Sequence, residues 1–210
     1  MPRPIRRYST AGGTTRDALT FGITAINDDN YTYDGTDSNG ALNRSDRSYV
    51  NDISSTRYDN RTFGHLVAQT GRSLPGNATV VSAILSIYAR GGSTVRHSSR
   101  WALEKALNPA TLTLKSELAL PEDGSGRSKT AILTWEPPTT WVTDNTYDID
   151  LTAQLREVRA LGTAAITLIN AFWFPLTKTY GGSNNNHAIY NYYTDPAKAM
   201  KLTVTYDVPA

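Results

Sequence analysis

With 210 residues and no cysteine, the chain can bury a full hydrophobic core but cannot form disulfides, thiolate nucleophiles or cysteine-ligated metal sites. Its formal net charge of +2 is too close to neutral to indicate nucleic-acid binding by itself, and no apolar run reaches the length of a membrane span. The start, MPRPIRRYSTAGG, is basic without the apolar stretch of a signal peptide, so we expect a protein made in a reducing cytoplasm and not exported.

Residues 1–17 are predicted to form an extended basic N-terminal arm, and residues 18–210 a single β-sandwich domain. The arm is rich in proline and glycine, which favour extended chain without periodicity. Two interpretations stay open, a disordered tail or an arm that lies on a neighbouring subunit. Under the second interpretation the candidate partner-binding residues are Arg3, Arg6, Arg7 and Arg16.

Alternation of apolar and polar residues predicts about ten strands. Their ranges are 18–26, 49–54, 62–69, 79–90, 100–106, 111–118, 130–135, 147–151, 163–170 and 201–206. The longest, 79–90, follows a turn at Leu74-Pro75-Gly76-Asn77 and is expected to point Val81, Ala83, Leu85, Ile87 and Ala89 into a core. Ile84 is the apolar exception on its other face. This pattern favours an all-β, two-sheet jelly-roll β-sandwich.

One short helix is predicted at about residues 152–161. Leu151, Leu155, Val158 and Leu161 fall on one stripe at helical spacing. Thr152 is the expected N-cap, and Gly162 is expected to end the helix.

We expect no catalytic, cofactor-binding or metal site, and therefore a protein that is not an enzyme. The three histidines, His65, His97 and His187, are far apart, and no hydrolase, nucleotide-binding or zinc motif is present. Nothing in the sequence selects a pair of carboxylates as acid and base. The alternative is calcium in the loop Asp28–Asp37, where oxygen ligands cluster without the spacing of an EF-hand.

Aromatic residues are the remaining candidates for a binding surface. Exposed rings can stack on sugars or anchor a protein interface. The residues proposed for either role are Trp141, Tyr190, Tyr192 and Tyr193. Trp135 and Trp173 are expected to lie in the core instead.

The segment 74–88 resembles the turn-and-strand signature "LP-x-G-A-T-V-x-S-A-x-L-x-L-Y" of the DNRLRE family of β-sandwich domains. The matching residues are Leu74, Pro75, Ala78, Thr79, Val80, Ser82, Ala83, Leu85, Ile87 and Tyr88. Asp150-Leu151-Thr152 is similar to the family's "D-x-T" before its helix, and 201–206 to its closing strand. The family's Arg-rich strand and its "S-R-E" motif are absent. The resemblance implies a jelly-roll fold of the kind found in tailed-phage structural proteins and carbohydrate-binding modules.

The features together favour a non-enzymatic virion structural protein, specifically a phage capsid cement or decoration protein that bridges capsid subunits. Its expected partners are the major capsid protein or other virion subunits and further copies of itself, for which we expect a trimer. A tail, collar or fibre subunit is an alternative within this class. A carbohydrate-binding module is the alternative outside it, and neither membrane nor nucleic acid is an expected partner.

Overall fold

The computed structural model describes residues 8–10, 13–25, 29–32, 48–50, 61–90, 98–113, 115–118, 126–137, 140–175, 187–190 and 192–210. This part of the chain contains twelve strands, one α-helix and two short 3-10 helices. The strands are β1 (Tyr8–Thr10), β2 (Thr14–Gly22), β3 (Asp29–Thr32), β4 (Ser48–Val50), β5 (Arg61–Ala68), β6 (Thr79–Tyr88), β7 (Ser99–Leu103), β8 (Leu133–Trp135), β9 (Thr146–Asp150), β10 (Leu168–Pro175), β11 (His187–Ile189) and β12 (Lys201–Pro209). The helices are α1 (Thr152–Arg159), η1 (Gln69–Gly71) and η2 (Lys115–Leu118). The all-β class expected from the sequence is confirmed. No helix in the described ranges is long and apolar enough to span a membrane.

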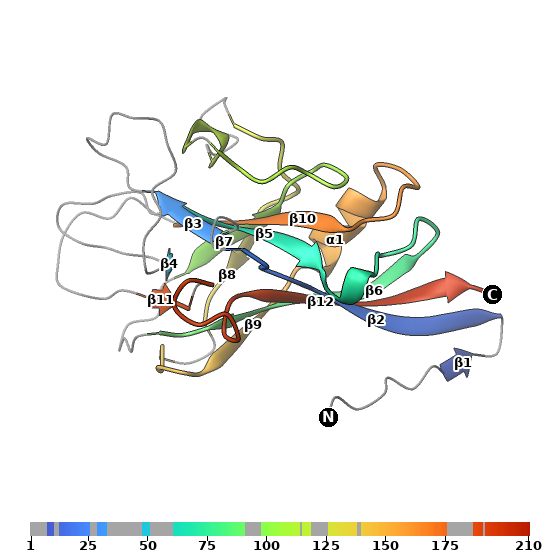
Figure 1. Ribbon diagram of the computed structural model, residues 1–210, viewed down its shortest axis with the longest axis horizontal. Coiled ribbons are helices and arrows are strands. Elements are labelled where there is room, and N and C mark those ends of the chain that lie inside the picture. The colour runs from blue at the N-terminus through green and yellow to red at the C-terminus, as the bar shows by residue number, and fades with distance from the viewer. Residues whose placement is uncertain are drawn as a thin grey trace.

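Eight strands lie side by side in one antiparallel path, in the order β8-β7-β10-β5-β2-β12-β6-β9 (Figure 1). Strands β1 and β3 pair with β2 and β5 beside this path, and β4 pairs with β11 in a separate two-stranded sheet. The pairs are nested along the chain: β2 with β12, β5 with β10, β6 with β9 and β7 with β8. Two residue pairs join β2 to β5, whereas nine join β2 to β12, so β2–β5 is the narrow link of the path.

The path curls until its two end strands approach each other. The rings of Trp135 in β8 and Tyr147 in β9 meet edge to face, with centroids 6.5 Å apart. No backbone pairing joins these two strands. The sheet is therefore nearly barrel-shaped, with aromatic side chains along the seam.

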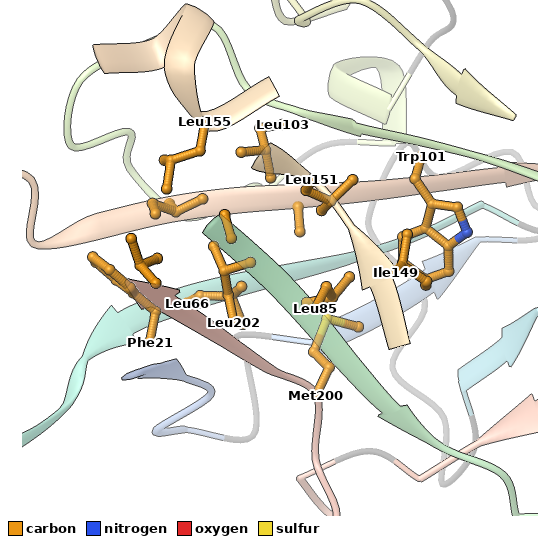
Figure 2. Packing of buried hydrophobic residues seen from close by; sticks show 14 of the residues in the cluster. Phe21, Leu66, Leu85, Trp101, Leu103, Ile149, Leu151, Leu155, Met200 and Leu202 are labelled. Atoms are coloured by element: carbon orange, nitrogen blue, oxygen red, sulfur yellow. The ribbon is translucent and has the colours of Figure 1, made fainter. Parts of the chain in front are cut away.

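The main core fills the space inside the curled sheet. Figure 2 shows Phe21, Leu66, Leu85, Ile149 and Leu202 pointing toward one another from five different strands. Each of these strands alternates inward apolar and outward residues, which is the periodicity that predicted the strands. At about 25 cal/mol per Å² of buried apolar surface, this core is the dominant stabilising term of the fold.

Strand β6 points its side chains as expected along most of its length, with one correction. Ala83, Leu85, Ile87 and Ala89 are fully buried. At the start of the strand, however, Val80 is buried and Val81 is not, because a β-bulge opposite Thr205 and Tyr206 shifts the register by one residue. The expected turn before β6 is present, closed by the Ala78 N–H donating to the Pro75 carbonyl at 3.1 Å.

Three strand predictions need larger corrections. The first predicted strand, 18–26, is β2 and begins at Thr14, so residues 14–17 belong to the sheet and not to the arm. Of the predicted strand 49–54 the structure describes only its start, in β4, and this short strand pairs with β11 and not with its neighbour along the chain, β5. The predicted strand 111–118 ends in the 3-10 helix η2, because its apolar residues pack down onto a sheet instead of alternating across one.

Those apolar residues help to cover the outer side of β5, β10 and β7. We call residues 104–113, 115–118 and 126–132, which connect β7 to β8, the covering segment; it is yellow-green in Figure 1. Leu112 and Leu118 from this segment form a second core with outward-facing sheet residues. The sheet residues of this core are Phe63, Ala102, Phe172 and Phe174.

Helix α1 lies where the stripe predicted it and is two residues shorter. Leu151, Leu155 and Val158 are buried in the main core, but Leu161 lies beyond the helix and is 44% exposed. Thr152 is not the N-cap: Leu151 holds that position, and the Thr152 hydroxyl accepts a hydrogen bond from the Ala83 N–H at 2.9 Å. This hydrogen bond joins the first residue of the helix to β6.

Candidate binding surface

The sequence-predicted tyrosines lie where three segments meet beyond the end of β6. The Tyr190 N–H donates to the Tyr88 carbonyl at 2.9 Å, and the Asp144 N–H donates to the Ala89 carbonyl at 2.7 Å. Ala89 in turn pairs with Ile189 in an isolated bridge. Backbone hydrogen bonds therefore hold the turn 141–145 and the segment 187–190, which contains β11, against the end of β6.

The side chains of Asp144, Lys198 and Tyr190, which we call the tyrosine surface, contact one another on this frame. The Tyr190 hydroxyl donates to Asp144 Oδ1 at 3.0 Å, and Lys198 Nζ lies 2.5 Å from the same oxygen. Lys198 Nζ also sits 4.5 Å from the centre of the Tyr190 ring, a cation–π contact. Tyr193 precedes Lys198 in the same segment of the chain and is 62% exposed.

The charges on the tyrosine surface stabilise each other. The hydrogen bonds from Lys198 and Tyr190 lower the pKa of Asp144, and the hydrogen bond to Asp144 raises the pKa of Lys198. Asp144 has φ of 67°, in the left-handed region that few residues other than glycine adopt. Asp is among the residues that tolerate this region, so the turn can present an exposed carboxylate there.

Trp141 does not contribute an exposed ring to this surface. It is 1% exposed and stacks on Tyr147, with ring centroids 4.3 Å apart and planes 10° from parallel. The Tyr147 hydroxyl donates to the Thr140 carbonyl and accepts from the Val142 N–H, each at 2.8 Å. Trp141 therefore belongs to the core, as Trp173 does, and Trp135 packs against that core half-buried.

The other two tyrosines are less exposed than Tyr193. Tyr190 is half-buried, and Tyr192 is half-buried and packed against the main core. Both follow β11 in the chain, because that strand ends at Ile189. Of the four aromatic candidates, Tyr193 alone is a largely exposed ring, and Tyr190 is partly accessible.

Of the arginines proposed to bind a partner, Arg3, Arg6 and Arg7 lie outside the described residues. Arg16 lies in β2 and forms a two-point contact with Asp207 in β12, at 2.8 and 2.9 Å. This contact raises the pKa of Arg16 and lowers that of Asp207. In this structure Arg16 therefore joins the two strands of its own sheet.

The calcium loop Asp28–Asp37 lies mostly outside the described residues, of which it contributes only the backbone of β3. Within the described ranges, no three His, Cys, Asp or Glu residues are grouped so that they could hold a metal ion. The side chains of His97 and His187 also lie outside the described part. His65 Nδ1 lies 2.6 Å from Asn170 Oδ1.

That histidine begins a buried polar chain that the sequence did not indicate. Asn170 Nδ2 donates to Glu104 Oε2 at 2.7 Å, and Arg127 binds Glu104 at 3.2 Å and Glu117 at 2.6 Å. Arg127 also donates to the carbonyls of Ala110 and Thr111.

Burial opposes the charge of Arg127, but its hydrogen bond to Glu117 and the charge of Glu104 outweigh burial and raise the pKa of Arg127. This polar network ties the covering segment to β5 and β10. Arg127 therefore has a structural role, holding the covering segment together through two carboxylates and two backbone carbonyls.

Compared with models of protein families and with curated proteins, the sequence matches none of them.

Proposed function

We propose that the chain is a non-enzymatic structural protein of a virion, and within that class a capsid cement protein that bridges neighbouring shell subunits. The observation that carries the proposal is the nested antiparallel pairing of β2 with β12, β5 with β10, β6 with β9 and β7 with β8. A chain folded as one long hairpin and then rolled into two layers has this pairing.

That pairing supports a two-sheet jelly roll. Dividing the path at the narrow β2–β5 link gives one sheet of β2-β12-β6-β9 and another of β5-β10-β7-β8, which face each other across the main core. Jelly rolls form the domains of viral capsids and of lectins. One fold hosts many functions, so the choice of a virion protein also depends on the cysteine-free composition and the basic N-terminal residues.

The attachment of the N-terminus supports a bridging role. Strand β1 pairs with the first residues of β2, and in Figure 1 this hairpin lies at the opposite end of the molecule from β4 and β11. It carries the segment with Arg3, Arg6 and Arg7. In the proposal these guanidinium groups bind carboxylates of the major capsid protein, where an interface shields them from salt.

The test is binding to capsids that lack the chain. Shells assembled from the major capsid protein of the same virus would be mixed with the purified chain, and the bound copies counted after sedimentation. Saturable binding at a fixed number of copies per shell, together with a higher melting temperature of the shell, is the expected result. Failure to bind shells, tails or fibres of that virus would overturn the proposal.

Carbohydrate binding is the second candidate, and the exposed ring of Tyr193, in the segment that also carries Lys198, favours it. Rings of this kind stack on sugar faces while charged groups bind hydroxyls. A glycan array run with the wild type and with Tyr193→Ala separates the two candidates. Glycan binding that Tyr193→Ala removes, without shell binding, would favour this second function.

A further inference from the structure

The two sides of the fold are covered differently. The covering segment packs over β5, β10 and β7, whereas the described elements that pack closely on β12 are its sheet neighbours β2 and β6. In Figure 1 the covering segment lies above the sheet, and β2 and β12 lie on the opposite, lower side. We call the outward residues of β2, β12, β6 and β9 the open face. Its central members are Ala18, Thr20, Lys201, Thr203, Thr205, Ser82, Ile84, Ser86, Asp148 and Asp150, and Arg16, Asp207, Tyr88 and Thr146 lie on the same face toward its ends.

Ile84 lies in the middle of the open face. Its cross-strand neighbours are Thr203 on one side and Asp150 on the other. The residues before and after it on the same face are Ser82 and Ser86, so a single large apolar side chain is surrounded by small polar ones. It is the residue that breaks the alternation of β6. Ile84 is half-buried by its neighbours on the sheet, and an interface would bury the rest of its side chain.

Two opposite charges flank the strand that carries Ile84. In the next row, Ser86 pairs with Lys201 in β12 and with Asp148 in β9. Adjacent strands are about 4.8 Å apart, so the two charges lie at nearly equal distances on opposite sides of β6. Lys201 Nζ donates to the Ala197 carbonyl at 2.6 Å, and Asp148 accepts from the Ser86 hydroxyl at 2.6 Å. Within the described part of the chain neither forms an ion pair.

We propose that the open face binds the open face of a second copy of this chain, related by a two-fold axis that runs parallel to β6. Rotation about this axis exchanges the two sides of β6 and leaves positions along the strand unchanged. Lys201 of each copy then lies opposite Asp148 of the other, so two ion pairs form. Ile84 lies opposite its own counterpart at the centre. The contact is isologous, as closed dimers require.

The charge pattern favours a second copy of this chain over a different protein as the partner of the open face. A foreign partner would need a matching charge pattern of its own, whereas the row Lys201–Ser86–Asp148 is complementary to itself under the two-fold. The inference does not depend on the proposed virion function. A two-fold contact is also compatible with the trimer expected from the sequence, because it can join copies that belong to neighbouring trimers.

Analytical ultracentrifugation over a concentration series tests the contact with the full chain. We expect a reversible dimer in the wild type and at least about a tenfold larger dissociation constant for Ile84→Lys. Leu161→Lys is the matched control, because Leu161 is an exposed apolar residue beyond α1, off the open face. Circular dichroism melting of each variant confirms that it is folded.

Charge reversal supplies the decisive comparison. Lys201→Asp and Asp148→Lys should each weaken the dimer by about tenfold or more, since each places like charges opposite one another. The double variant should recover the affinity of the wild type, because it reverses both members of each pair. A wild type that stays monomeric, or a dimer unaffected by these changes, would overturn the proposal, as would a double variant that does not recover.

A cross-link gives an independent measurement. Because the chain has no cysteine, Ser86→Cys introduces a single thiol close to the two-fold axis. A short bismaleimide should join two copies of this variant, and it should not join copies of Leu161→Cys under the same conditions. Equal cross-linking of both variants would contradict the proposed axis.

Discussion

Gly76 approaches the backbone of Thr163 so closely that a Cβ atom at this glycine would lie 1.7 Å from the Thr163 carbonyl oxygen. Gly76 is not needed for a positive φ, since that angle lies outside the left-handed region. The approach follows from the bridge between Leu74 and Ile166, whose backbones exchange two hydrogen bonds of 2.9 Å. The turn before β6 is thereby fastened to the segment between α1 and β10.

Replacement of Gly76 by alanine should therefore destabilise the protein. The new methyl group would meet a backbone atom that cannot rotate away, and we expect a loss of at least about 2 kcal/mol. Chemical denaturation measures it. Asn77→Ala, at the exposed neighbouring position of the same turn, is the control and should change stability much less. Equal stability of both variants would contradict the close approach.

Leu85→Asp should prevent folding. Leu85 is fully buried between Ile149 and Leu202, its cross-strand neighbours, so the aspartate would place an unpaired charge in the main core. Thr203→Asp, exposed on the next strand, is the control and should leave a cooperative melt. Thermal melting followed by circular dichroism distinguishes them. A Leu85→Asp variant that melts cooperatively would show that β6 faces the other way.

The sequence predicted features that depend on residues close together in the chain better than features that depend on contacts between distant strands. The alternation of β6 and the stripe of α1 are local patterns, and they placed Leu85 and Leu155 in the core correctly. Val81 was assigned to the core wrongly because it is the extra residue of a β-bulge in β6, which only the pairing of β6 with β12 reveals. Sequence periodicity within one strand carries no information about the register of another.

The binding surface was less predictable for the same reason. Trp141 and Tyr193 are both aromatic residues in loops, and composition cannot distinguish a ring stacked on Tyr147 from one exposed to solvent. Arg127 was missed because its partners Glu104 and Glu117 meet it only when the covering segment folds back over β10, which no local pattern marks. Polar networks closed by tertiary contacts have no periodic signature.

Arg127→Met should loosen the covering segment. It leaves the Glu104 carboxylate, which is 7% exposed as a residue, without its cationic partner, and breaking such a pair costs about 3–5 kcal/mol. Relative to the wild type, the variant should show a larger increase in amide hydrogen-exchange rate in residues 104–113 than in β6. Arg127→Lys should lose less stability, since it keeps the charge but not the fork that spans two carboxylates. Unchanged stability of Arg127→Met would contradict this role.

The ionised form of Asp144 should contribute stability that acid removes. Its folded pKa is lowered below the ordinary value of 3.8 by Lys198 and Tyr190, so the contribution is complete above the ordinary value. It is lost as the pH falls through the lowered pKa. Asp144→Asn keeps a residue that tolerates the left-handed turn. Its melting temperature should lie slightly below that of the wild type at pH 7 and match it at the acid end. A difference that persists in strong acid would contradict the assignment.

The predicted arm, residues 1–17, should contain two parts with different roles. Residues 14–17 pair with β12, and Arg72 joins Asp17 at 2.5 Å and donates to the Ala18 carbonyl at 3.0 Å. Deletion of residues 1–17 should therefore lower the melting temperature of the isolated domain. Deletion of residues 1–7 should leave it unchanged, because none of these strand contacts is lost.

The shorter deletion then tests the proposed role of Arg3, Arg6 and Arg7 without damaging the sheet. We expect the chain lacking residues 1–7 to bind undecorated shells more weakly than the full chain, with the difference shrinking as salt screens the arginines. The triple substitution of these arginines by glutamine is the matched variant and should reproduce the loss. Shell binding that survives both changes would show that attachment depends on another surface, and the basic segment would no longer support the cement proposal.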